Sequence, residues 1–258
     1  MNFFFGLKFD ELKCLLTIPK FTNENNYLKD VCLFSAKVYK NSWLIQKQIC
    51  EQDNNFFYLN ISSKQKNDIF FIAKNNLLKN KNTIRVNELS SFYKVKMSFL
   101  NFRSNLKIYN KIGEFSSYQA EYPLEMCERT GSILTPISSF VNQEQNNIAV
   151  FKQIYYLPVK KTFFVYILDL LTKKVLKKQT FYTNSTNIIN LSKLKQIKNC
   201  CIYSEDYLGI PIFISYGKKR GISMEHSHPP QIYLLSKNKF KVISNLKRKV
   251  KEIVSKST

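Results

Sequence analysis

The 258-residue sequence predicts an all-β protein, a β-sandwich-like fold of antiparallel strands followed by one basic C-terminal α-helix. Short runs of β-branched and aromatic residues recur along most of the chain, separated by Asn, Ser, Gly or Pro. Apolar residues at sustained helical spacing occur only near the C-terminal end. With 44% hydrophobic and 14% aromatic residues, the chain can build a packed core, which excludes wholesale disorder.

The expected strands cover residues 3–9, 31–39, 56–62, 69–74, 99–109, 115–122, 133–141, 148–157, 163–170, 175–182, 188–191, 200–204, 210–216 and 222–235. The clearest hairpin spans residues 163–175, where Asp169 and a polar Thr-Lys-Lys turn reverse an apolar strand. Its first arm is apolar on both faces. This pattern is typical of a strand in the interior of a sheet.

Residues 75–91 are polar and lack a sustained apolar period, which indicates a domain boundary. We therefore expect an N-terminal β-rich domain over residues 1–92, a C-terminal β-sandwich-like domain over 93–240 and a basic amphipathic helix over 241–258. In that helix, apolar residues recur at helical spacing between lysines and an arginine. Packing of its apolar stripe on the β core is the preferred interpretation, and docking on an anionic membrane or a partner is the alternative.

The charge balance favours an anionic partner. Lys and Arg number 40 and Asp and Glu number 18, so the net charge is +22. However, only five basic residues are arginines, the residue preferred for bidentate contacts with phosphates and base edges. Lysine is enriched together with Asn, Ile, Phe and Tyr, as an AT-rich coding sequence would produce. Nucleic acid is therefore a secondary alternative as the partner.

The sequence predicts a cytoplasmic protein without a transmembrane segment. Its first residues lack the basic region of a signal peptide. The longest apolar run, residues 163–171, contains Asp169 and falls short of the roughly 20 residues that a membrane helix needs. The six cysteines include no C-x-x-C pair, so we expect free thiols. The adjacent Cys200 and Cys201 should point to opposite faces of a strand.

Both histidines of the chain, His226 and His228, lie two residues apart. A loop over residues 217–221, with glycine at each end, precedes them and suits a hairpin. We expect Tyr216 to pair with Ile222 across this hairpin.

The expected register assigns a face to each neighbour of the histidines. It places Ile212 opposite His226 and Ile210 opposite His228, and cross-strand partners share a face. The two imidazoles then lie on an apolar face, and Glu225 points to the other face, where it cannot join them as a ligand.

Three interpretations of the histidine pair remain open. The pair could bind zinc or iron, the cofactors that this residue type favours, with a third ligand from outside the hairpin. Alternatively, the imidazoles bind a polar ligand at the rim of a pocket, or they are structural. The candidates for the third metal ligand are Asp206, Glu121, Glu125 and Glu128.

The loop that precedes the histidines carries Lys218, Lys219 and Arg220. Along a straight strand, Arg220 would lie roughly 20 Å from His226, so one small ligand could not touch both. The loop is interpreted either as a solvated turn that discourages edge pairing or as an anion-binding element.

A second candidate lies on the strand over residues 115–122, which places hydroxyls, an amide, a carboxylate and aromatic rings together. Such side chains can hold sugar rings by stacking and hydrogen bonding, and they also occur on ordinary exposed strands. The candidate ligand-binding residues of this strand are Tyr118, Gln119 and Glu121.

These observations predict a protein that acts mainly by binding a polar or anionic small molecule or glycan, for example in cell-surface polysaccharide assembly. Two alternatives are a metal-dependent β-fold enzyme that uses His226 and His228, and a basic interaction module for nucleic acid or a ribonucleoprotein.

Overall fold

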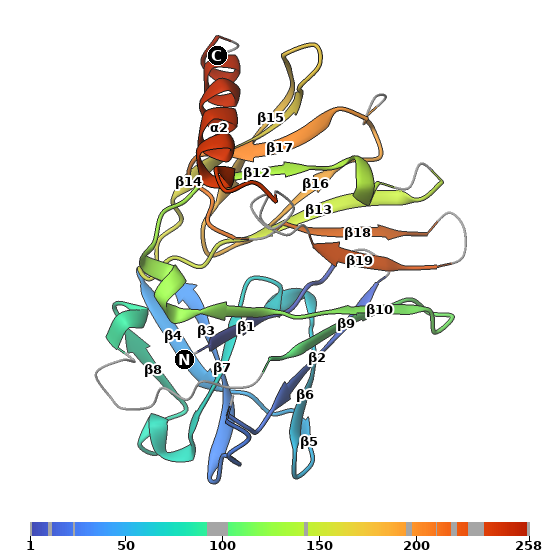
Figure 1. The fold of residues 1–258 in the computed structure, drawn as a ribbon. Coiled ribbons are helices and arrows are strands. Elements are labelled where there is room, and N and C mark those ends of the chain that lie inside the picture. Colours follow the sequence, from blue (N-terminus) through green and yellow to red (C-terminus); the bar gives the residue numbers. More distant parts are fainter. Residues whose placement is uncertain are drawn as a thin grey trace. The chain divides into compact units, whose positions relative to one another are not determined.

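The computed structural model describes residues 2–9, 12–22, 24–91, 103–141, 144–194, 198–209, 211–217, 221–226 and 235–256. Four β-sheets dominate this part of the chain, and α2(Lys239–Ser255) is its only α-helix (Figure 1). The strand pairings defined by the described residues are antiparallel, as in the hairpins β3–β4 and β14–β15. The predicted all-β fold with a C-terminal helix is confirmed.

The chain forms two compact units, each described here by itself. Unit 1 contains residues 1–129, 154–160 and 183–186, and unit 2 contains residues 130–153, 161–182 and 187–258. The division between these two units therefore differs from the expected boundary at residue 92. The reason is that strands after this residue return to the first unit, where β9(Asn105–Tyr109) pairs with β2(Lys13–Pro19) and β11(Glu121–Pro123) pairs with β1(Asn2–Phe5).

Unit 1 contains two sheets. The strand order in the first is β11(Glu121–Pro123), β1(Asn2–Phe5), β7(Ile69–Lys74), β3(Val31–Tyr39), β4(Ser42–Lys47) and β8(Thr83–Val86). The order in the second is β10(Phe115–Tyr118), β9(Asn105–Tyr109), β2(Lys13–Pro19), β6(Phe56–Asn60) and β5(Glu51–Gln52). The consecutive strands β10 and β11 lie at edges of different sheets, so the chain passes from one sheet to the other between Tyr118 and Glu121.

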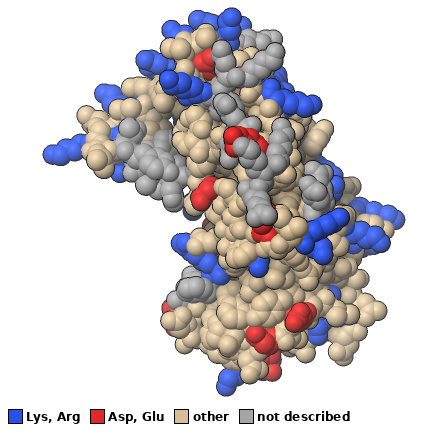
Figure 2. All heavy atoms as spheres, turned by 90° about the vertical axis from the view of Figure 1, so that its right-hand side faces the viewer, with Lys and Arg blue, Asp and Glu red and all other residues tan. Residues whose placement is uncertain are grey.

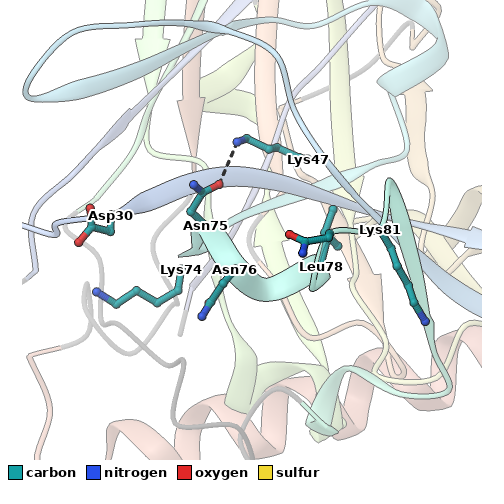
Figure 3. A pocket seen from close by; sticks show the side chains of 8 residues that line it. Asp30, Lys47, Lys74, Asn75, Asn76, Leu78 and Lys81 are labelled. Carbon is teal, nitrogen blue, oxygen red and sulfur yellow. Dashed lines mark hydrogen bonds between the residues drawn. The ribbon is translucent and has the colours of Figure 1, made fainter.

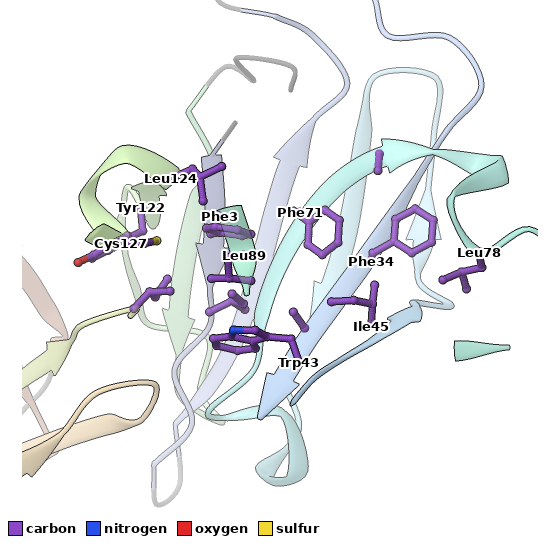
Figure 4. Close-up of a cluster of buried hydrophobic side chains, with 14 residues drawn as sticks. Phe3, Phe34, Trp43, Ile45, Phe71, Leu78, Leu89, Tyr122, Leu124 and Cys127 are labelled. Atoms are coloured by element: carbon purple, nitrogen blue, oxygen red, sulfur yellow. The ribbon is translucent and has the colours of Figure 1, made fainter. Parts of the chain in front are cut away.

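The first sheet of unit 1 is buried on both faces. Phe70 and Phe71 are adjacent on β7, point to opposite faces and are both fully buried. On one face, Phe71 stacks on Phe34 and meets Phe3 edge to face, in a cluster that also contains Trp43 (Figure 4). Full burial of one such side chain contributes about 1.5–3 kcal/mol relative to exposure. This cluster therefore anchors the strands that carry the groove described below.

Unit 2 is a sandwich of two four-stranded sheets. One has the order β12(Ile133–Pro136), β17(Cys200–Ser204), β14(Thr162–Asp169) and β15(Lys174–Tyr182). The other has the order β16(Thr186–Asn190), β13(Asn146–Lys152), β18(Ile212–Tyr216) and β19(Ser223–His226). A single buried cluster takes residues from both sheets, among them Phe151 of β13, Phe163 of β14 and Phe213 of β18. A shared core of this kind defines a sandwich.

The predicted hairpin of β14 and β15 is confirmed. Asp169 pairs with Lys174 across it, and the Asp169 Oδ1 atom accepts hydrogen bonds from the backbone N–H groups of Leu171 at 2.9 Å and Thr172 at 3.3 Å. Lys173 completes the turn with a φ of 54°. Residues of β14 join buried clusters on both faces of its sheet, Ile167 on one face and Leu168 on the other, which explains why the strand is apolar on both faces.

Helix α2 packs on the outer face of the β12-β17-β14-β15 sheet. Val250 and Val254 join a buried cluster with Leu168 of β14 and Tyr203 of β17. The preferred interpretation of the basic helix, packing on the β core, is therefore confirmed. In the described part of the chain, no helix has both the length and the apolar character needed to cross a membrane.

Candidate functional site

The histidine hairpin has the register expected from the sequence. Ile212 pairs with His226, Phe213 with Glu225 and Ile214 with Met224. The two glycines that frame the loop, Gly217 and Gly221, have φ values of +100° and +105°. Residues that have a side chain rarely adopt φ values in this range, so glycine is required at both ends of the loop.

His226 is half-buried at the end of β19, beside residues that are buried. Its cross-strand partner Ile212 is 2% exposed, and Met224, two residues before it, is 3% exposed. Glu225 is exposed on the other face and is therefore removed from the imidazole, as expected. His228, Lys218, Lys219 and Arg220 lie outside the described residues, so their roles stay predictions.

The described residues supply no ready metal centre. No group of three or more His, Cys, Asp or Glu side chains within the described ranges is arranged to hold a metal ion. Three of the candidate third ligands, Glu121, Glu125 and Glu128, belong to unit 1, whereas His226 belongs to unit 2. All six cysteines are free, as predicted, and Cys200 and Cys201 join clusters on opposite faces of β17.

The candidate strand residues Gln119 and Glu121 meet around Arg103, which sequence reasoning did not identify. The Arg103 Nη1 atom donates to Gln119 Oε1 at 2.7 Å, and Arg103 Nε lies 3.6 Å from Glu121 Oε1. Burial raises the pKa of the Glu121 carboxyl, against the opposing effect of the Arg103 charge. Burial and the nearby Glu121 charge raise the pKa of Tyr118 to about 12. Arg103 and Glu121 thus form an ion pair near the point where the chain passes from one sheet of unit 1 to the other.

One carboxylate oxygen of this cluster, Glu121 Oε2, is buried and has no hydrogen-bond partner among the described residues. A hydroxyl group could donate to it, but Arg103 is 64% exposed and Glu121 is 20% exposed, so water also reaches the pair. The cluster therefore supports a polar contact and not a desolvated catalytic carboxylate.

A larger site lies at one end of the first sheet of unit 1 (Figure 3). It is an open groove of about 730 Å³ at the ends of β4 and β7 and in the turn before β8. We call it the lysine groove, and its lining residues are Asp30, Lys47, Lys74, Asn75, Asn76, Leu78, Asn80 and Lys81.

Backbone geometry at the groove accounts for two of its lining residues, Asp30 and Asn80. After β7, the chain enters the short 3₁₀ helix η2(Asn75–Leu78), and Lys79 and Asn80 follow with φ values of 46° and 64°. Asp30 has a φ of 55°, and its carbonyl accepts a hydrogen bond from the Asn75 N–H at 2.9 Å. Asn and Asp tolerate this left-handed region better than other residues with a side chain.

The charge of the groove is positive. Three lysines against one aspartate give 3 − 1 = +2 at its walls. Lys47 Nζ donates to Asn75 Oδ1 at 2.9 Å, and Lys74 Nζ donates to the Lys29 carbonyl at 3.0 Å (Figure 3 shows the first of these bonds). The Lys47 bond uses one of the three protons that an ammonium group can donate. The groove can therefore offer several donors to an anionic ligand.

The lysine groove was missed from the sequence because most of its residues, from Asn75 to Lys81, fall in the polar segment that we interpreted as a domain boundary. The available signal was the run Lys74-Asn75-Asn76 followed by Asn80-Lys81. On the face of the molecule drawn in Figure 2, Lys and Arg side chains occur at several separate places. The groove is distinguished by its concave shape together with its charge.

A scan against protein-family models, a search of curated proteins and a search of solved structures each find no match to this chain.

Proposed function

We propose that this protein binds a polar anionic ligand of the acidic carbohydrate class in the lysine groove of unit 1. The observation that carries the proposal is the lining of the groove, in which three lysines and three asparagines surround an open volume of about 730 Å³. Ligand sites commonly occupy about 300–1,000 Å³, so the groove has room for a short oligosaccharide.

The side-chain types support an acidic sugar over other anions. Lysine ammonium groups pair with carboxylate or sulfate groups, and each asparagine amide offers both a donor and an acceptor to neighbouring hydroxyls. Sugars present acidic groups and hydroxyls together. Among the described residues, the lining contains no aromatic side chain, so binding through ring stacking, as for neutral sugars, is not supported.

The same lining argues against the nucleic-acid alternative at this groove. Bases are usually held by stacking on aromatic side chains, and phosphates by the bidentate fork of arginine. Neither residue type lines the groove in the part of the chain that the structure describes. Binding of nucleic acid here would rest on lysine charge alone and would not distinguish it from other polyanions.

A cytoplasmic location accompanies the proposal, supported by six free cysteines, since oxidising compartments favour disulfides. An acidic glycan met there would be an intermediate of polysaccharide assembly before export.

Isothermal titration with a panel of ligands tests this proposal. A uronic acid tetrasaccharide should bind, maltotetraose of similar size should not, and a single-stranded oligonucleotide of equal charge should bind more weakly than the tetrasaccharide. Raising the salt concentration from about 0.05 to about 0.5 M should weaken binding of the tetrasaccharide, because salt screens exposed charges beyond a few ångströms. Equal binding of maltotetraose, or stronger binding of the oligonucleotide, would contradict the proposal.

A further inference from the structure

A second pocket lies in unit 2, where the C-terminal end of α2 meets the outer face of the β12-β17-β14-β15 sheet. Its volume is about 210 Å³, and it uses none of the residues of the lysine groove. We call it the aromatic pocket. Its lining residues are Phe164, Tyr166, Tyr203, Glu205, Asp206, Lys251, Val254 and Ser255.

Aromatic rings form one side of this pocket. Phe164 and Tyr166 alternate on β14, so both side chains lie on the same face, with ring centroids 6.4 Å apart. Phe164 is 39% exposed, while Tyr166 and Tyr203 are buried except for the part that faces the pocket. The faces of such rings carry partial negative charge and attract cations.

Two carboxylates stand beside the rings, in a chain that is poor in acidic residues. The Tyr203 hydroxyl donates to Glu205 Oε1 at 2.9 Å, and Lys251 Nζ lies 3.1 Å from Glu205 Oε2. Asp206 is exposed and forms no hydrogen bond or ion pair with the described residues. Its full negative charge is therefore available at the pocket.

The protein's own ammonium groups already occupy cation positions here. Lys178 Nζ lies 4.6 Å from the ring centroid of Phe164 and 5.7 Å from that of Tyr166. Lys251 supplies the second cation, paired with Glu205. Both lysines are exposed and end flexible side chains, so another cation can exchange with them.

The end of α2 adds to this preference. Val254 and Ser255 line the pocket, and they belong to the last turn of a helix of 17 residues. The aligned peptide dipoles of a helix give its C-terminal end about half a negative charge, which favours cations. The rings, the carboxylates and the helix end therefore all attract positive charge.

We propose that the aromatic pocket binds an organic cation, either an alkylammonium or a guanidinium group, carried by a small molecule or by a basic peptide. The volume suits one such group with its alkyl stem. The net charge of +22 does not oppose binding strongly at physiological salt, because charges farther away than about 8 Å are screened.

The test is an NMR titration of the full chain with arginine amide and with citrulline amide, its isostere with an uncharged side chain, both N-acetylated so that the α-amino group carries no charge. Arginine amide should shift the aromatic signals of Phe164 and Tyr166 with millimolar affinity, and citrulline amide should not. Asp206→Asn should lower the affinity for arginine amide about threefold, as expected for the loss of one exposed charge. Lys178→Gln should instead raise this affinity about two- to fivefold, because a competing cation is removed from the rings.

The matched control is Glu51→Gln, which makes the same charge change on an exposed strand of unit 1 and should leave the affinity unchanged. An equal loss in Asp206→Asn and Glu51→Gln would overturn the proposal, and so would equal binding of the two amides or weaker binding by Lys178→Gln. Comparing arginine amide with a Gly-Arg-Gly peptide identifies the source, since tighter binding of the peptide indicates a peptide ligand and tighter binding of the amide a small molecule.

Discussion

Lys47 Nζ donates a hydrogen bond of 2.9 Å to Asn75 Oδ1 and thereby joins the end of β4 to the start of η2 (Figure 3). The same oxygen accepts from Cys32 Sγ at 3.2 Å. Asn75 therefore holds the Lys47 ammonium at the wall of the lysine groove, where it faces an incoming ligand with its remaining protons.

We expect substitutions of Asn75 to change ligand affinity more than stability. Asn75→Asp places a carboxylate against Lys47 and cancels one positive charge, so affinity for a uronic acid tetrasaccharide should fall about five- to tenfold. Asn75→Ala should reduce it less, because the charge of Lys47 remains. Isothermal titration of both variants checks this order, and a larger loss in Asn75→Ala would refute it.

Leu168 and Leu171 offer a matched pair of leucines on one hairpin. Leu168 is fully buried beneath α2, whereas Leu171 is 75% exposed in the turn. Leu168→Ala should lower the free energy of unfolding by about 2–5 kcal/mol, because it removes buried methyl groups and leaves a cavity. Leu171→Ala should change it by less than about 0.5 kcal/mol. Urea denaturation measures both, and similar effects would mean that α2 does not cover this face.

Lys247 ties α2 to the start of β12. Its Nζ atom donates to the carbonyl of Ser132 at 2.6 Å and to the Ser132 hydroxyl at 3.0 Å, and burial lowers the pKa of the ammonium group. Lys247→Ala should reduce stability by about 1–2 kcal/mol, because these bonds are lost. The exposed Lys249 is the control, and Lys249→Ala should have little effect. Thermal unfolding of the two variants provides the comparison.

Stability should fall at high pH because two buried thiols resist ionisation. Burial raises the pKa of Cys14 and of Cys201 from 9.0 to about 12. Below pH 9 both states keep these protons, so the contribution to stability is fully present. Above it, only the unfolded chain loses protons, and the contribution declines until it is lost near pH 12.

Urea midpoints at about pH 8 and about pH 10.5 reveal this decline. The variant Cys14→Ala should show a smaller drop between the two conditions than the wild type, and Cys14→Ala with Cys201→Ala a smaller drop still. An identical drop in all three proteins would assign the pH dependence to other groups.

Local pattern was sufficient for β3, β7 and β17, whose expected bounds agree with the structure, since each is rich in apolar residues and is ended by polar ones. Four strands were missed, namely β2, β4, β5 and β8. β8 alternates exposed and half-buried residues inside a polar segment. β4 follows a tight turn at Lys40 and Asn41, and the sequence does not predict their φ values of 44° and 58°.

The lysine groove could not be predicted for a related reason. It brings Lys47 at the end of β4 close to Lys81 just before β8, and this proximity depends on the pairing of Gln46 with Thr83. The local sequence pattern does not predict which strands pair with one another. The histidine register was predictable, because a short loop framed by glycines fixes which residues face one another.

The most direct test of the central claim compares two variants that lose the same charge. The groove variant carries Lys47→Gln, Lys74→Gln and Lys81→Gln, and the control variant carries the same change at the exposed Lys13, Lys64 and Lys111 of unit 1. Titration with the uronic acid tetrasaccharide should show a loss of at least about tenfold in the groove variant and less than about twofold in the control. Equal losses in both would contradict a ligand site in the lysine groove.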